Sequence, residues 1–248
     1  MDINCDMGEG ISLADCLSDN QLMPYITRCN IACGGHAGSE AIIRETILNA
    51  KRHKLSIGAH PGYEDKANFG RKSLDQSVER TVESVQKQLE CFFEIARQCE
   101  VKVDHIKLHG ALYNDIENSE NSRSENELGR RLVKLFQSDY DQVLILGLAQ
   151  GQLAHLCKNS GLIFFGEAFI DRRYLANGKL SPRNISGAVI QDAEQASAQA
   201  LNLIEKKPIE TLDGHSILIE AQTLCIHGDN PAALGILQAI QSRSKINH

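Results

Sequence analysis

The chain has 248 residues, of which 42% are hydrophobic and 23% are charged, an ordinary balance for a globular protein. Its formal net charge of −6 argues against nucleic acid and anionic membranes as partners. The N-terminal sequence MDINCDMGEG is acidic and lacks the basic start and apolar run of a signal peptide. No stretch approaches the roughly 18 consecutive apolar residues of a membrane-spanning helix. We therefore predict a cytoplasmic protein.

The eight cysteines are scattered along the chain and form no CxxC pair. This usage is typical of free thiols in a reducing compartment, and it disfavours a disulfide framework or a zinc knuckle. Cys33 is the candidate for a reactive thiol, because it lies in a glycine-rich turn.

Short apolar runs alternate with longer helical patterns along the chain. Strands are predicted at 2–6, 27–32, 55–60, 104–109, 143–147, 162–167 and 223–227. Helices are predicted at 39–52, 75–99, 124–137, 191–206 and 231–243. The stretch 75–99 is the clearest, because its apolar residues recur every three or four positions and form one stripe.

Helix starts are predicted from their capping residues. Ser39 is expected to cap 39–52, and Ser73 with Gln76 to form a capping box for 75–99. Asn230 followed by Pro231 predicts the start of the last helix. Two connections stand out: 114–125 is polar and expected to be exposed, and 166–187 is long enough to suggest a functional loop.

Repeated strand–helix alternation predicts parallel strands joined by crossover helices. No linker or change of composition divides the chain, so we predict one α/β domain over 1–248. A single-domain irregular (β/α) barrel with about seven parallel strands is the favoured fold, and an open doubly wound sheet is the alternative.

Polar residues gather where the predicted strands end. In parallel α/β folds these carboxyl ends open on one common face, where ligands bind. Lys107 and His109 share one face of their strand, and a lysine that points into a core needs a partner or a function. The residues at or after these strand ends are Asp6, Glu9, His36, His60, Lys107, His109, Glu167, His227 and Asp229.

Each of these residues also has a structural reading. A histidine at a strand end is more often hydrogen-bonded than catalytic, and Asp229 and Asn230 would serve as helix caps. Asp6, His60, His109 and Glu167 are adequate metal ligands, but their spacing matches no compact metal motif. The chain has neither a GxxxxGK[ST] phosphate loop nor a GxGxxG motif. The gathering of polar strand ends, more than any single residue, favours a site.

Several motifs occur in an order that resembles the LamB/YcsF family, the A subunits of bacterial ATP-dependent 5-oxoprolinase. They are DINCDMGEG, NIACGGHAGSE, IGAHPGYEDKANFGR, IKLHGALYN, GEAFIDRRYLANGKLSPR, GAVI and CIHGDNP, spread over about residues 2–240. The chain departs from the family at three places. Gly35 replaces a usual Phe, which is expected to widen the pocket; Ser39-Glu40 replaces Asp-Pro; and Leu108 replaces Pro.

The resemblance implies an irregular (β/α) barrel like that of glycoside hydrolases and polysaccharide deacetylases. It also implies hydrolysis of 5-oxoproline to glutamate, with ATP as cosubstrate, Mg²⁺ accompanying the ATP, and B and C subunits as partners. A homo-oligomer is compatible with it. Whether the protein itself binds a metal stays open, with Asp6, His60 and His109 as candidates.

Roles for the catalytic candidates follow from the chemistry of a stable lactam, which becomes open to attack by water once its oxygen is phosphorylated. Lys107 would stabilise charge at that oxygen, and His60 and His109 would transfer protons. Asp6, with Glu9, would orient water or bind Mg²⁺.

Substrate binding is expected from the remaining polar residues of the rim. Arg172 and Arg183 would hold the substrate carboxylate, although a solvated or ion-paired loop is the competing reading. His227 with the 228–231 turn would hold an anion. The predicted substrate-binding set is Glu9, His36, Glu167, Arg172, Arg183, His227 and Asp229.

Two other functions compete with the lactam-hydrolysing subunit. A stand-alone metal-dependent deacetylase or amidohydrolase would need a metal and ignore ATP. A non-catalytic ligand-binding subunit would tolerate substitution of Asp6 or His109 without loss of rate.

Overall fold

The computed structural model describes residues 2–118 and 126–243. Within them, seven parallel strands close into a barrel in the order β1-β2-β3-β4-β5-β6-β9. The predicted α/β barrel is therefore confirmed, and the open sheet is excluded. The barrel strands are β1 (Asp2–Met7), β2 (Arg28–Ala32), β3 (Ser56–His60), β4 (His105–Lys107), β5 (Leu144–Leu148), β6 (Phe164–Phe169) and β9 (Thr223–His227).

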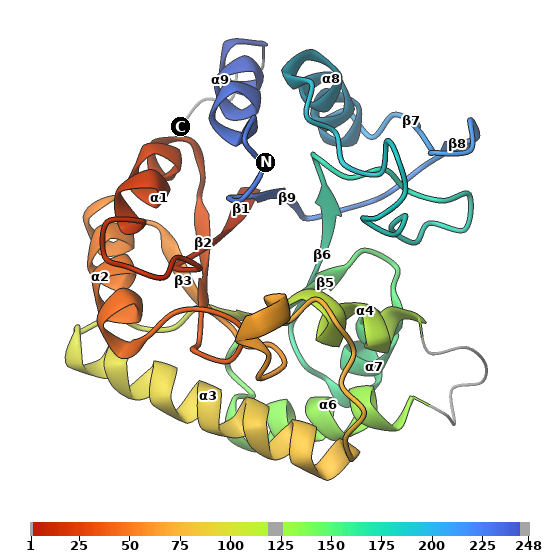
Figure 1. Ribbon diagram of the computed structural model, residues 1–248. Coiled ribbons are helices and arrows are strands. Elements are labelled where there is room, and N and C mark those ends of the chain that lie inside the picture. The colour runs from red at the N-terminus through yellow and green to blue at the C-terminus, as the bar shows by residue number, and fades with distance from the viewer. Residues whose placement is uncertain (1, 119–125, 244–248) are drawn as a thin grey trace.

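Helices surround the barrel, with α1 and α2 on one side, α3 and α6 along another, and α8 and α9 together on a third (Figure 1). Two short strands, β7 (Ile209–Glu210) and β8 (Ser216–Ile217), form a small antiparallel pair outside it. The helices are α1 (Cys16–Leu22), α2 (Glu40–Arg52), α3 (Val78–Gln98), α4 (Gly110–Asn118), α6 (Glu127–Asp139), α7 (Gln152–Ser160), α8 (Ala193–Ile204) and α9 (Ala233–Arg243), with 3₁₀ turns η1 (Met23–Tyr25) and η2 (Lys66–Asn68).

The helix caps were predicted correctly in part. Ser39 does cap α2, because its hydroxyl accepts the N–H of Ile42. The capping box at Ser73 was wrong: Ser77 caps α3 by accepting the N–H of Arg80, whereas Ser73 donates to Asp115. The apolar stripe of α3 is buried along the helix and packs into the core between the barrel and the outer helices. This burial stabilises the helix over its whole length.

Other boundaries also differ from the predictions. Residues 114–118 belong to α4 instead of an exposed loop, and the rest of the predicted loop lies outside the described residues. The side chain of Asn230 does accept the N–H of Ala232, but α9 begins only at Ala233. No sequence pattern had indicated α1, α4, α7 or the β7–β8 pair.

Register places residues from distant segments at the same height in the barrel. Asp6 on β1 is paired with Asn30 on β2 and with His227 on β9. Every neighbouring strand pair in the barrel is parallel, so the carboxyl ends all open at one end.

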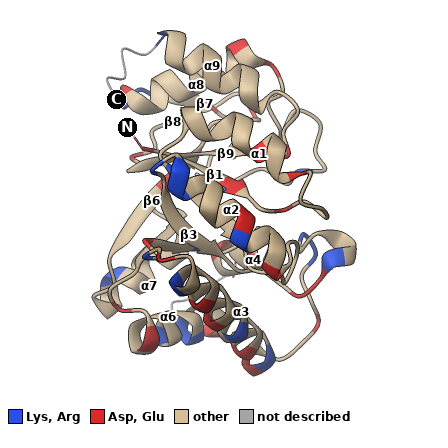
Figure 2. Ribbon diagram, turned by 90° about the vertical axis from the view of Figure 1, so that its left-hand side faces the viewer, with Lys and Arg blue, Asp and Glu red and all other residues tan. Residues whose placement is uncertain are grey.

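The outer helices carry charges of both signs. Figure 2 shows Lys and Arg interspersed with Asp and Glu along α3 and α6. None of the helices in the described ranges is long and apolar enough to cross a membrane. All eight cysteines are free, as predicted. Cys33 is not a reactive thiol in this fold, because burial raises its pKa far above the ordinary value.

Gly58 makes room for a ring inside the barrel. A Cβ there would lie 2.2 Å from two ring atoms of His105 on the next strand. We expect Gly58→Ala to destabilise the protein by about 1–3 kcal/mol, because the ring must move within a packed interior. Urea denaturation measures this. The control is Gly235→Ala, an exposed glycine in α9, which should be neutral or stabilising; equal losses in both variants would contradict the packing argument.

Candidate active site

A cavity of about 390 Å³ opens at the carboxyl end of the barrel. It lies where register and the loops after the strands bring polar side chains together. Predicted site residues in its wall are Asp6, His60, Lys107, His109, Arg172, Arg183 and His227. The long connection after β6 forms one side of the cavity with Leu180–Asn184, so the functional reading of that connection is supported.

Lys107 projects into the barrel and is only 2% exposed. Its Nζ lies 2.9 Å from Asp6 Oδ1 and 3.2 Å from Glu167 Oε2. It also donates to Asn4 Oδ1 at 3.2 Å and contacts Cys225 Sγ at 3.1 Å. The partner that a buried lysine requires is thus supplied by two carboxylates, one from β1 and one from β6.

Charge pairing outweighs burial for both members of the Lys107–Asp6 pair. Burial would lower the pKa of Lys107, but the facing Asp6 and Glu167 raise it well above its usual range. Burial would raise the pKa of Asp6, but His60 and Lys107 hold it well below its usual range. The pair is therefore ionised at neutral pH, at the floor of the cavity.

A chain of polar side chains beneath the pair was missed by the sequence analysis. Asn30 Nδ2 donates to Asn4 Oδ1 and Asp6 Oδ1, both at 2.8 Å. His105 Nε2 lies 2.7 Å from Asn30 Oδ1 and donates to it, because an amide oxygen only accepts. The two-residue alternation of a strand could have indicated them. Asn4 lies on the same strand face as Asp6, and His105 lies on the same face as Lys107.

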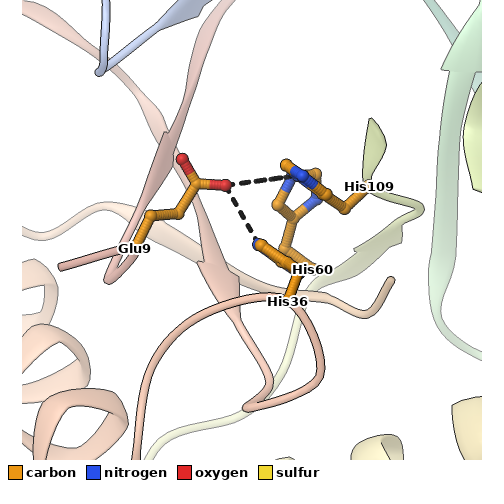
Figure 3. A group of neighbouring side chains, drawn as sticks. All are labelled: Glu9, His36, His60 and His109. Atoms are coloured by element: carbon orange, nitrogen blue, oxygen red, sulfur yellow. Dashed lines mark hydrogen bonds and ion pairs between the residues drawn. The ribbon is translucent and has the colours of Figure 1, made fainter. Parts of the chain in front are cut away.

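Three histidines surround Glu9 beside the cavity (Figure 3). Glu9 Oε1 lies 3.0 Å from His36 Nε2, 3.2 Å from His109 Nδ1 and 4.0 Å from His60 Nε2. His60 Nε2 is also 3.4 Å from Asp6 Oδ2. The four side chains come from the loops after β1 and β2, the end of β3 and the segment after β4, so only closure of the barrel brings them together.

Burial keeps the imidazoles of His36 and His109 neutral. Desolvation lowers the pKa of His36 to about 4 and lowers the pKa of His109, although Glu9 opposes both shifts. Burial would raise the pKa of Glu9 itself, but its contacts with His109 and His36 hold it below the usual range. His36 and His109 are thus neutral imidazoles beside a carboxylate at neutral pH.

Arginines line the mouth of the cavity. Arg172 is 5% exposed and its Nη2 donates to Ser181 O at 2.6 Å, while its Nε has no hydrogen-bond partner among the described residues. Burial, then Arg183, lowers the pKa of Arg172 to about 10, so it stays charged. Arg183 is 3.8 Å from Asp229, which also pairs with Arg71.

His227 is oriented by a residue that the sequence analysis did not select. Asp171 Oδ1 lies 2.8 Å from His227 Nδ1, and Asp171 Oδ2 accepts from Asn230 at 3.1 Å. No sequence signal marked Asp171, because it lies in an irregular connection without periodicity. The turn after β9 is thereby fixed against the connection after β6.

Not every predicted site residue lines the cavity. Glu9 and His36 lie behind His109, and Glu167 is fully buried behind Lys107. Asp229 is engaged by arginines at the rim, which explains why it does not face inward. The expected widening at Gly35 was wrong, because Gln88 fills the space: a Cβ on Gly35 would lie 2.4 Å from Gln88 Oε1.

Comparison with known proteins matches this geometry to a family. The LamB/YcsF family model matches residues 1–247. The chain belongs to the LamB/YcsF family. Among its LamB/YcsF relatives, the 5-oxoprolinase A subunit of Staphylococcus carnosus (strain TM300) is 36% identical over 243 residues, covering 98% of this chain and 94% of the relative. The protein of the same name from Syntrophobacter fumaroxidans (strain DSM 10017 / MPOB) is 37% identical over 241 residues, covering 97% and 92%.

A solved structure agrees with the LamB/YcsF assignment. The lactam utilization protein from Thermus thermophilus superimposes with a TM-score of 0.86 at 30% identity, covering 98% of this chain and 96% of the other. The barrel described above is therefore the fold of a protein whose name refers to lactam use.

Removing the ammonium of Lys107 tests the electrostatics of this LamB/YcsF barrel. We expect Lys107→Met to lose about 3–5 kcal/mol in chemical denaturation, because the carboxylates of Asp6 and Glu167 would be left buried and unpaired. Combining it with Asp6→Asn should recover part of the loss. The control is Lys102→Met at an exposed lysine, expected within about 0.5 kcal/mol of wild type; a similarly small effect at Lys107 would contradict the pairing.

Proposed function

We propose that this chain is the A subunit of an ATP-dependent 5-oxoprolinase, a hydrolase that opens the lactam of 5-oxoproline to give glutamate, with ATP converted to ADP and phosphate. The names of the relatives and of the Thermus structure support the family role. The observation that carries the proposal is a small cavity with an anion-binding arginine at its mouth, and with an ionised carboxylate beside imidazole groups at its floor.

Arg172 fits the carboxylate of a small amino-acid-like substrate. Its guanidinium is buried, lines the cavity and keeps a free Nε, and an oxygen ligand there would replace water lost on burial. Arg183 adds a second positive charge at the same mouth. His227, held by Asp171, lines the same cavity and completes the anion-binding side.

The reaction can be balanced with ATP as cosubstrate and Mg²⁺ accompanying it. The lactam oxygen attacks the γ-phosphorus and ADP leaves. Water then adds to the ring carbon, the C–N bond breaks, and the nitrogen takes a proton. A second water releases phosphate and leaves glutamate. Water activation and protonation of nitrogen are the steps that need groups such as Asp6, His60 and His109.

The role first assigned to Lys107 changes in the light of its contacts. Its three N–H groups donate to Asp6, Asn4 and Cys225, and the carboxylate of Glu167 lies at ion-pair distance on the other side. Such an ammonium has little capacity left for a phosphorylated oxygen. We propose instead that Lys107 is a positioning residue that keeps Asp6 ionised and facing His60.

Partner subunits of the B and C type belong to the proposal, because the names of the relatives describe one component of a larger assembly. An apolar surface suited to such a partner lies just after Glu9. Ile11 is 98% exposed, and Leu13 and Leu17 are 54% and 65% exposed. Large apolar side chains exposed together are more typical of an interface than of free surface.

The decisive experiment is glutamate release from 5-oxoproline with purified A, B and C subunits and Mg²⁺-ATP, omitting one component at a time. Loss of activity on each omission is expected. Activity of this chain alone without ATP would instead support a stand-alone metal-dependent amidohydrolase, which the histidine cluster keeps as the second candidate. Unchanged rates after substitution of Asp6 or His109 would indicate a non-catalytic binding subunit.

Arg172→Gln should raise the KM for 5-oxoproline roughly 10- to 100-fold with a smaller effect on kcat, because a charge-assisted hydrogen bond is worth about 1.5–3 kcal/mol. Steady-state kinetics of the reconstituted complex measure both constants. The neighbouring Arg173 is the matched control, because its side chain contacts Glu210 and Gln195 on the outer surface. A KM that rises equally in Arg173→Gln, or in neither variant, would remove Arg172 from the substrate site.

A further inference from the structure

The contacts of His60 and His109 fix which nitrogen of each ring carries its proton. His60 Nδ1 lies 2.8 Å from the carbonyl oxygen of Lys107, and His109 Nε2 lies 3.0 Å from that of Phe69. A carbonyl oxygen only accepts, so in each ring the nitrogen that faces it carries a proton. The other nitrogens, His60 Nε2 and His109 Nδ1, are therefore the ones that can offer lone pairs to a metal ion.

These two nitrogens face each other at 3.0 Å. With the carbonyl-facing nitrogen of each ring used as a donor, the two facing nitrogens are free to bind one ion between them. Glu9 Oε1 adds a negative charge 3.2 Å from His109 Nδ1, and in the described part of the chain its ion pairs are with histidines alone. The centre of this group thus places a carboxylate oxygen beside two imidazole nitrogens.

We infer that Glu9, His60 and His109 bind a divalent transition-metal ion of the zinc type. A tetrahedral ion with bonds of about 2.0–2.1 Å holds its ligand atoms roughly 3.3–3.4 Å apart. The three donor separations here, 3.0, 3.2 and 4.0 Å, bracket that value. Two imidazoles and one carboxylate form a common ligand set for a catalytic zinc.

Backbone carbonyls act as the second shell that such ligands require. Metal-bound histidines usually donate their other ring N–H to a carbonyl or carboxylate, which fixes tautomer and ring orientation. Both imidazoles already do so, through Lys107 O and Phe69 O. Because Lys107 is itself locked in the barrel, the carbonyl that orients His60 is held in place as well.

His36 holds Glu9 and is not a fourth ligand. Its ring is stacked on that of His109, with centroids 3.6 Å apart and planes 2° from parallel, so the in-plane lone pairs of the two rings do not converge on one point. Its Nε2 is 3.0 Å from Glu9 Oε1 and donates to it. Its donor atom nevertheless lies within 4.8 Å of the other three, as expected of a supporting residue.

Asp6 was a predicted metal candidate, but the group that the structure gathers contains Glu9 instead. Asp6 is already neutralised by Lys107 and lies 3.4 Å from His60 Nε2. Since His60 and His109 line the cavity, the open side of the ion would face it. An ion there would lower the pKa of a bound water; His60 and His109 would then act as its ligands in place of transferring protons, and Asp6 would be left for proton transfer. This use rests on the proposed function. The binding itself does not.

Metal titration of the purified full chain tests the site without ATP, lactam or partner subunits. After treatment with a chelator, we expect one Zn²⁺ per chain by equilibrium dialysis, and tetrahedral visible bands with Co²⁺. His60→Ala and His109→Ala should abolish stoichiometric binding, and Glu9→Gln, which keeps the size of the side chain, should weaken it more than His36→Ala does. Loss of a supporting residue costs roughly 10- to 100-fold in affinity.

His53→Ala is the matched control, because His53 is exposed and lies between α2 and β3 at the opposite end of the barrel. It should bind Zn²⁺ like wild type, and circular dichroism should confirm that every variant is folded. No stoichiometric Zn²⁺ in wild type, or unchanged affinity in folded Glu9→Gln, would overturn the inference and leave a shared proton between the rings. Neither result would bear on glutamate release, so the two proposals fail separately.

Discussion

The buried ammonium of Lys107 is the interaction on which the rest of the site depends. It lies between Asp6 and Glu167, which come from strands far apart in sequence, and it makes the interior of the barrel a place where carboxylates can stay ionised. Without it, both acids would be buried with no positive charge beside them, which is costly in free energy. The charge that it holds on Asp6, and the carbonyl that it presents to His60, are both functional consequences of a structural pair.

The cavity combines two regions of different character. At the floor, ionised and neutral groups are held rigidly by strands and by hydrogen bonds to backbone carbonyls. At the mouth, Arg172, Arg183 and Arg71 come from connections, and the last two pair with Asp229. Rigid strands suit chemistry that needs fixed geometry, whereas connections can adapt to a substrate that enters and leaves. A rigid floor and an adaptable mouth would suit the proposed substrate, a small anion whose lactam bond is stable.

Prediction from sequence was most successful where local patterns dominate. The seven barrel strands were placed within two residues of their observed ends, because strand faces and turn residues are written in the local sequence. The prediction of helix caps was less reliable, because Ser77 and not Ser73 caps α3. Where several serines precede a helix, tertiary packing decides which of them is the cap. Asn4, Asn30 and His105 were overlooked, because buried polar residues resemble ordinary strand residues until their partners are known.

By itself, the sequence determined the alternation of strands and helices, the polar residues at the strand ends and the family. Only the tertiary structure decided that Glu9 and His36 join His60 and His109, that Lys107 is used up by carboxylates, and that Gln88 fills the space beside Gly35. The physical reason is that local propensity depends on neighbours along the chain. Charge pairing and ligand geometry depend instead on distances of a few ångströms between segments, and closure of the barrel alone sets those distances.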